Sequence, residues 1–489
     1  MSRARCILWQ GRAAGAAPIR EAFVTPMRVP VWRAVRGAAV AWGLGAAVAA
    51  AQTAAPLPQV AVPPINITLP NYSSVAVGEI GSLEANASLV RANDSSTAWY
   101  NPAGLGLATQ SSVSGSAGTF QAGRIRPEEI QSSGGSFQQI PSTVGFTIKN
   151  LFGNPDWAGG LSIAHVNAWS QSLSTAQGVA VDPNAGRLMY SGVSDMSGWM
   201  ANLAVARRTG RRLRLGASLD VQKTDIDRDG AQSALLLTGT DLGSFLVDSK
   251  VSASVVHLRG SVGAHYDITP AFRLGALVRT PGLAISRSGS FSHEGAVSVG
   301  TATTTASFFE PGGDVEYRVP FEFKVGVAVL LERAQFEVDV NTWTGGDPYA
   351  AFRSTATWTI VTDLGNGSVP TVQTPALAAP IVDPAAVMNV AIGGQYHLNA
   401  NGSWMVHGGF ATDRSPVGPE DTFFTKAHMQ ALTVGVSGRT TLILGSVGLR
   451  YQWGTTGEFS LRRFQDSSPL KTRFKLSTIG IVYSVGLLF

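Results

Sequence analysis

Apolar residues alternate strictly with other residues at the end of the chain. In the eleven residues 479–489, every odd position is apolar and the even positions between are mostly small. A period of two residues is typical of a β-strand whose two faces meet different surroundings. Eleven residues also match the length of one tilted transmembrane β-strand. We therefore predict a strand whose apolar face is formed by Ile479, Ile481, Tyr483, Val485, Leu487 and Phe489.

The same period occurs in residues 321–331 and 334–341, which a two-residue turn at 332–333 separates. In the second of these segments, apolar residues alternate with Gln335, Glu337, Asp339 and Asn341. A soluble β-sandwich would place these polar side chains in water, whereas a barrel would place them in its lumen. The period alone does not distinguish the two folds.

Short and long connections alternate along the chain, which favours a barrel. Bacterial outer-membrane barrels combine short periplasmic turns with long external loops and have an even number of strands. Six turns and seven loops here predict fourteen strands, with both ends of the barrel on the periplasmic side. The turns lie at 153–156, 209–211, 267–270, 332–333, 399–402 and 438–439. The loops are predicted at 123–140, 170–196, 225–249, 284–316, 344–383, 413–425 and 454–474.

Composition agrees with a membrane barrel. The chain is 44% hydrophobic and only 14% charged, well below the roughly 25% charged residues of soluble domains. This hydrophobic content excludes a disordered chain. Outside the N-terminus, no stretch approaches the ~18 consecutive apolar residues of a membrane helix. A large soluble β protein and a membrane barrel remain, and a barrel conceals its apolar residues in alternate positions.

A secretion signal is predicted at the N-terminus. Arg28, Arg33 and Arg36 precede the apolar run 37–51, which ends in small residues. A positive region, an apolar region and small residues at a cleavage site define a signal peptide. We assign residues 1–51 to it and interpret Met27 as the true start, because a signal beginning at Met1 would have an unusually long positive region. The only cysteine, Cys6, lies within this leader.

The leader also accounts for the net charge of +5. Seven of the 37 basic residues lie in residues 1–51, against one of the 32 acidic residues. The remaining chain is therefore within one charge of neutral, which argues against a nucleic-acid partner.

Candidate sites for chemistry are few. Asp225, Asp227 and Asp229, followed by Gly230, are spaced like the start of a calcium loop, but Leu236 stands where such a loop needs a glutamate. We interpret these carboxylates as part of an acidic loop, with a bound cation as the alternative. The chain has no G-x-S-x-G or H-E-x-x-H motif. We expect neither an enzyme nor a cofactor, although a Ser–His pair that meets only in the fold stays open.

One segment resembles a known family. Residues 94–105 include the sequence Asn101-Pro102-Ala103-Gly104-Leu105 after a stretch of small residues. This resembles the N-terminal signature of the FadL/TodX family of outer-membrane transporters for hydrophobic compounds. Later fragments follow in the same order as in that family: 274–281, 319–326 with 339–343, and 408–417. The terminal Phe489 is similar to the aromatic C-terminus that marks chains for outer-membrane assembly.

The resemblance implies an all-β fold, a 14-stranded antiparallel transmembrane β-barrel with an N-terminal hatch inside the lumen. Residues 52–108 would form the lead-in and the hatch, and residues 109–489 the barrel. Asn101, Pro102, Ala103 and Gly104 would hold the hatch against the wall, where Pro102 restricts Asn101 to extended conformations. In this family a kinked third strand opens the wall, and Gly159 and Gly160 are our candidates for such a defect.

The implied function is passive uptake of hydrophobic small molecules, with lateral release, in the outer membrane of a Gram-negative bacterium. The ligand would be a fatty acid, an alkane or an aromatic hydrocarbon, and the other partners outer-membrane lipid and the barrel-assembly machinery. We expect a monomer. Two other classes stay open: a lipid-modifying barrel enzyme, and a general porin or adhesin. A porin would not need the plug-like segment that precedes the first strand.

Overall fold

The computed structural model describes residues 67–489, except 128–133, 182–183, 239–240, 355, 364, 366–370, 375–378, 401 and 463–468. The predicted signal peptide, its start at Met27 and the lead-in at 52–66 lie outside the described residues. None of the helices in the described part has the length and apolar character needed to cross a membrane.

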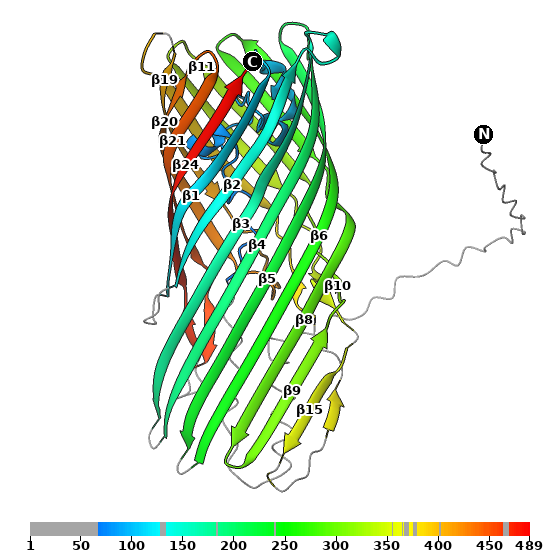
Figure 1. Ribbon diagram of the computed structural model, residues 1–489, viewed down its shortest axis with the longest axis vertical. Helices are drawn as coiled ribbons and strands as arrows, with labels where there is room; N and C mark the ends of the chain where they lie inside the picture. Colours follow the sequence, from blue (N-terminus) through cyan, green and yellow to red (C-terminus); the bar gives the residue numbers. More distant parts are fainter. Residues whose placement is uncertain are drawn as a thin grey trace, which may run out of the picture. The chain divides into compact units, whose positions relative to one another are not determined.

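In the described part of the chain, fourteen antiparallel strands pair in sequence order and close into a barrel (Figure 1). The circuit closes where the last strand pairs with the first, from Ser112 opposite Leu488 to Pro127 opposite Phe474. The strands of the wall are β1 (Ser112–Pro127), β2 (Gly134–Lys149), β3 (Trp157–Val181), β4 (Asn184–Thr209), β5 (Leu213–Thr238), β6 (Asp241–Thr269), β7 (Phe272–Arg279), β11 (Glu322–Leu330), β12 (Ala334–Trp343), β18 (Val387–His397), β19 (Trp404–Asp413), β20 (Ala427–Arg439), β21 (Ile443–Thr456) and β24 (Phe474–Leu488).

The alternation in the sequence corresponds to the two faces of this wall. On β24, Val485 is 54% exposed on the outer face, whereas Ser484 is 7% exposed on the inner face. On β12, Phe336 and Val338 are exposed outward, whereas Glu337 and Asp339 are buried inside the barrel. The polar row on β12 therefore faces the lumen, and the barrel interpretation is confirmed.

Several predicted loops are in fact strands. Strands β3 to β6 are 25 to 29 residues long, far beyond the 9–11 residues that cross a membrane. They continue as a paired sheet through most of 170–196 and 225–249, where we predicted loops. The reason is that polar residues facing solvent on a projecting sheet look like loop residues in the sequence. On β5 the outer face changes from exposed Val221 to Lys223, which is ion-paired with Asp225.

Strands outside the circuit extend the wall or fold over it. Strand β8 continues beyond β7 along β6, after an interruption at residues 280–282. The connection predicted at 454–474 contains a short hairpin, and the turn predicted at 438–439 lies at 440–442 instead. These elements are β8 (Leu283–Val299), β9 (Ala302–Glu310), β10 (Asp314–Val315), β13 (Tyr349–Ala350), β14 (Phe352–Arg353), β15 (Trp358–Asp363), β16 (Thr371–Thr374), β17 (Ile381–Val382), β22 (Phe459–Arg462) and β23 (Pro469–Thr472).

Residues 67–107 lie inside the barrel, and we call them the N-terminal segment. Its helical pieces, α2 (Glu79–Leu83), α3 (Thr97–Tyr100) and the 3₁₀-helix η1 (Pro102–Leu107), are seen in blue near the C-terminus in Figure 1. A further 3₁₀ turn, η2 (Leu151–Gly153), connects β2 and β3. Helices this short are unstable alone. The wall contacts described below therefore hold the segment in place.

Candidate functional site

The Asn-Pro-Ala-Gly motif fixes the end of the N-terminal segment to the wall. The backbone of Asn101 is extended, with φ −164° and ψ 107°, as expected for a residue before proline. Its side-chain amide donates to the carbonyl oxygens of Ala264 on β6 and Ala276 on β7, at 3.3 and 3.2 Å. Its Oδ1 accepts from the N–H of Ala103 at 3.1 Å and so caps η1. One side chain thus makes the turn and also binds two wall strands.

Two wall glycines provide the space for this motif. A Cβ atom on Gly216 of β5 would overlap the backbone of Pro102 and Ala103, and one on Gly263 of β6 would overlap the Asn101 amide. Gly104, the last residue of the motif, is itself packed against Thr97 and the His265 ring. The close approach of the two backbones depends on these missing side chains.

Arg279 of β7 holds the preceding helix α3. Its Nη2 donates to the carbonyl oxygen of Trp99 at 2.5 Å, and its guanidinium lies 4.5 Å from the centre of the Trp99 ring. Asp220 and Glu322 bind the remaining nitrogens at 3.1 and 2.7 Å. Lys324 approaches the same ring at 5.0 Å and pairs with Glu322. Buried charges need such complete pairing, and here the pairing also fixes Trp99.

A second charged cluster holds the middle of the segment. Arg91 bridges Glu84, on the segment, and Glu337, on β12. Asp339 accepts the N–H groups of Ser88 and Leu89 at 3.0 and 3.1 Å. Burial alone would lower the pKa of Arg91, but the neighbouring Glu84 and Glu337 carboxylates raise it above its usual value. The Arg91 guanidinium therefore stays charged inside the barrel.

Glu79, at the start of α2, is a further buried carboxyl group of the segment. Burial, followed by repulsion from Asp94, raises the pKa of Glu79 to about 8. Its N–H donates to Asp94 at 3.0 Å. The carboxyl group of Glu79 is therefore protonated at neutral pH.

The opposite end of the segment is held by Arg228 of β5. Its Nε donates to Thr68 Oγ1 at 2.8 Å, and its Nη2 contacts the carbonyl oxygen of Phe423. The guanidinium also lies 4.1 Å from the Phe423 ring. Thr425 donates to the Thr68 carbonyl oxygen at 2.9 Å. The connection between β19 and β20 and the N-terminal segment therefore share one cation.

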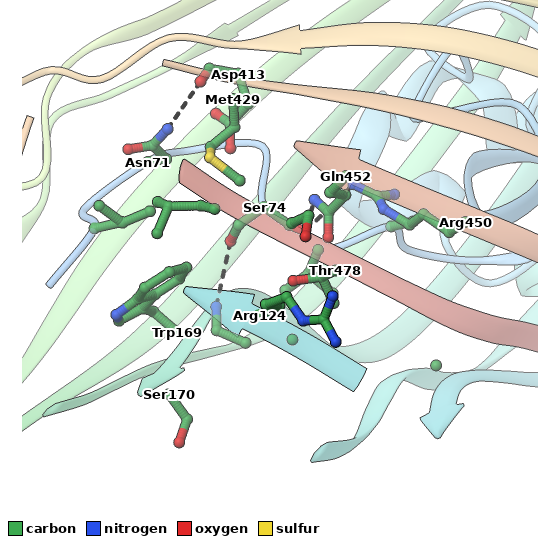
Figure 2. Close-up of a pocket in the computed structure, with 18 of the residues that line it drawn as sticks. Asn71, Ser74, Arg124, Trp169, Ser170, Asp413, Met429, Arg450, Gln452 and Thr478 are labelled. Atoms are coloured by element: carbon green, nitrogen blue, oxygen red, sulfur yellow. Dashed lines mark hydrogen bonds between the residues drawn. The ribbon is translucent and has the colours of Figure 1, made fainter. Parts of the chain in front are cut away.

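A pocket lies between residues 69–76 of the segment and the wall (Figure 2). Strands β1, β2, β3, β19, β20, β21 and β24 supply the other side. Its apolar lining includes Leu69, Val75, Trp169, Met429 and Leu476. Its polar lining includes Asn71, Arg124, Asp413, Arg450 and Gln452. Polar and apolar residues line this pocket in similar numbers, whereas the usual small-molecule site is mainly apolar with a few convergent polar groups.

The wall beside this pocket is interrupted. Among the described residues, β2 pairs with β3 from Lys149 opposite Ala158 to Thr143 opposite Ala164, and the ladder then ends. Beyond this point β3 remains paired with β4, and this pairing has a register shift between His165 and Asn167. Ser142 and Ala168, on either side of the interruption, both line the pocket. Gly159 and Gly160, our candidates for a defect, lie in β3 and are regularly paired on both sides.

The remaining predicted site residues lie apart from the pocket. The outer face of β5 carries Asp225, Asp227 and Asp229, and the residues between them are buried on its inner face. Asp227 accepts a hydrogen bond from the Ser252 hydroxyl group at 2.6 Å. Across the described ranges, no group of three His, Cys, Asp or Glu residues is placed to hold a metal ion. Phe489 follows β24, donates its N–H to Ser111 at 3.0 Å and exposes 70% of its surface.

Sequence reasoning missed Arg450 and the lumenal role of Asp413. Asn71 donates to the carbonyl oxygen of Asp413, 342 positions away, at 2.8 Å. Neighbours this distant leave no local pattern. A weak signal existed for Arg450, since it is a charged residue between apolar Leu449 and Tyr451 on a predicted membrane strand.

Comparison with known proteins places the fold. A crystal structure of a Pseudomonas aeruginosa FadL homologue matches 86% of this chain and 100% of its own, with a TM-score of 0.54 and 13% identity. The Ralstonia pickettii toluene transporter TbuX matches 86% of this chain and 98% of its own (TM-score 0.47, 14% identity). The P. putida toluene transporter TodX matches 81% and 94% (TM-score 0.49, 13% identity). No family model and no curated protein matches the sequence. The likeness to the FadL homologue, over its whole length, shows that this chain has the fold of the FadL/TodX barrels.

Proposed function

We propose that this protein is a bacterial outer-membrane channel for passive uptake of hydrophobic small molecules. The observation that carries the proposal is the pocket under the N-terminal segment, beside the end of the β2–β3 ladder. A water-filled porin would not require a segment packed along its lumen. Here the segment is bound to wall strands β6, β7 and β12.

The proposed path begins at the end of the barrel where the strands project, which we take to be outside the cell. A hydrophobic molecule would reach the pocket and contact Leu69, Trp169 and Leu476. Burial stabilises it by about 0.8 kcal/mol per CH₂ group, so binding needs little specific chemistry. Release is the harder step, and the interruption between β2 and β3 offers a lateral route into lipid.

In this scheme the N-terminal segment is a movable hatch, and Asn101, Pro102, Ala103 and Gly104 are its anchor. Two wall hydrogen bonds from Asn101 hold the closed state. A neutral hydrogen bond contributes about 1 kcal/mol, so this anchor can be released on binding of a ligand. A lid that opens slowly would set the rate of transport.

Uptake in a strain lacking its own transporter tests the proposal. Cells expressing this chain should accumulate a radiolabelled hydrophobic compound, such as an alkylbenzene or a long-chain fatty acid, faster than cells carrying an empty vector. Replacing Ala168 with Trp should narrow the route beside β2 and slow uptake. Equal accumulation with and without the protein, at a confirmed level of folded barrel, would exclude this function.

A further inference from the structure

Three residues that line the pocket have buried polar side-chain atoms without a hydrogen-bond partner. Within the described residues, Arg450 Nε and Nη1, Asp413 Oδ2 and Asn71 Oδ1 have no hydrogen-bond partner. Arg450 and Asp413 are each 4% exposed, and Asn71 is 1% exposed. Leaving such groups unpaired costs free energy. A ligand that forms hydrogen bonds with these atoms would therefore remove this free-energy cost.

These atoms belong to one locus. Asp413 accepts the N–H of Ser73 at 3.0 Å, and Arg450 Nη2 donates to the Ser74 carbonyl oxygen at 3.3 Å. Asn71 donates to the backbone of Asp413 at 2.8 Å. Asn71, Asp413 and Arg450 are thus connected through the short stretch 71–74, and all three line the pocket (Figure 2).

The locus offers donors and acceptors together, which limits the ligand chemistry. A hydrocarbon would satisfy none of the four atoms. A carboxylate would satisfy Arg450 but would leave Asp413 Oδ2 without a donor and place its charge beside it. A hydroxyl group both accepts and donates, so it can take a hydrogen bond from Arg450 and give one to Asp413 or Asn71.

We propose that this pocket selects hydrophobic molecules that carry a hydroxyl group, such as an alcohol or a phenol. Arg450 and Asp413 bind the hydroxyl group. Leu69, Trp169 and Met429 contact the apolar body. The inference rests on the proposed function, because it names the ligand class of the same channel.

Binding of three ligands with one skeleton tests it. Ethylbenzene, 2-phenylethanol and phenylacetate differ only at the end of the side chain. Their affinities are measured at pH 7.5 for the full barrel in lipid nanodiscs, since detergent would compete for the pocket. The wild-type protein should bind 2-phenylethanol more tightly than phenylacetate. A tighter phenylacetate complex would overturn the inference in favour of an anion site.

Variants then separate the contribution of the hydroxyl group to binding from that of the apolar body. Arg450→Met should lower the affinity for 2-phenylethanol about tenfold relative to that for ethylbenzene. This is the effect of losing one hydrogen bond to a charged group. Asp413→Asn should lower the affinity for 2-phenylethanol and raise the affinity for phenylacetate. Arg333→Met, in the exposed turn after β11, serves as the matched control and should change none of the three affinities. An unchanged ratio in both pocket variants would overturn the inference, because solvent alone would then satisfy these atoms.

The outcomes also distinguish the inference from the proposed function. Ethylbenzene binding without any dependence on Arg450 or Asp413 would overturn the hydroxyl site and leave the channel intact. Failure of all three ligands to bind would count against the channel itself. Heat-modifiable mobility on gels confirms that each variant is folded. If Arg450→Met does not fold, Asp413→Asn against the Arg333→Met control gives the comparison.

Discussion

The hydroxyl oxygens of Ser95 and Ser114 lie 2.7 Å apart, one on the N-terminal segment and the other on wall strand β1. A second pair, Ser446 and Ser484, has the same 2.7 Å separation but joins two wall strands, β21 and β24. The first pair connects the segment to the barrel, whereas the second pair lies wholly within the wall. Cysteines at the two pairs can therefore tell whether the segment moves.

A disulfide between Ser95→Cys and Ser114→Cys should block uptake, and a reductant should restore it. The cross-link fixes the segment to β1, so a hatch that must move cannot open. The double variant Ser446→Cys with Ser484→Cys is the control and should transport normally when oxidised. Full uptake through the oxidised Ser95–Ser114 variant would rule out a moving hatch.

Replacing Asn101 and Pro102 together with alanine should alter uptake while leaving barrel assembly intact. The change removes two hydrogen bonds to β6 and β7, or about 2 kcal/mol of anchoring. Uptake per folded molecule is measured against folded yield on gels. If the motif only turns the chain, the yield should fall and the uptake per folded molecule should stay the same.

Glu79 should make the stability of the N-terminal segment in its packed position, which we call its seating, depend on pH. Its pKa is raised from 4.5 to about 8, so the seated segment binds more protons than the free one between these values. Seating is therefore strongest below about pH 4.5 and weakens as the pH rises toward 8. Amide hydrogen exchange in residues 79–83 should speed up over this range beyond its intrinsic pH dependence. Glu79→Gln should remove that excess, and an excess that persists in the variant would assign it to another group.

Charge on the outer face of β24 should be costly. Val485→Arg places a guanidinium against lipid, which costs ~2–4 kcal/mol at the middle of a membrane and less near its edge. Ser484→Arg places the same charge on the lumenal face and should cost less. Folding titrations in lipid vesicles compare the two variants. Equal losses would mean that the two faces are assigned incorrectly.

Phe489 should matter for assembly more than for the finished barrel. Its side chain is 70% exposed, so removing it costs the fold few contacts. If the aromatic end marks the chain for assembly, deletion of Phe489 should reduce folded barrel in the outer membrane but leave refolding in vitro unchanged. A normal yield in cells would contradict this role.

The strands of the wall could be predicted from the sequence because the alternation of apolar and polar residues is a local pattern. Alternation on β11, β12 and β24 separates the two faces of each strand, and short turns separate the strands. The lengths of β3 to β6 could not be predicted, because beyond Val221 the outer face of β5 becomes polar. Pairing there depends on neighbouring strands and leaves no mark on a single segment.

Much less of the candidate site could be predicted. Asn101 was recognisable because its segment resembles a family signature, and Pro102 restricts its backbone locally. Arg450, Asp413 and Asn71 come together only when the barrel closes, and each alone looks like an ordinary polar residue. The interruption beside β2 likewise depends on where a ladder ends. It was expected at Gly159 and Gly160, whereas β3 changes register near His165.

Arg228 holds Thr68 at one end of the lumen, the Arg91 cluster holds the middle of the N-terminal segment, and Asn101 is bound at the other end. A segment fixed at several points is released stepwise and not as one rigid body. Release of Asn101 would free the part that follows the Arg91 cluster, whereas Arg228 would keep the first residues in place. Transport would then leave the barrel partly filled, and closed to larger solutes, throughout each cycle.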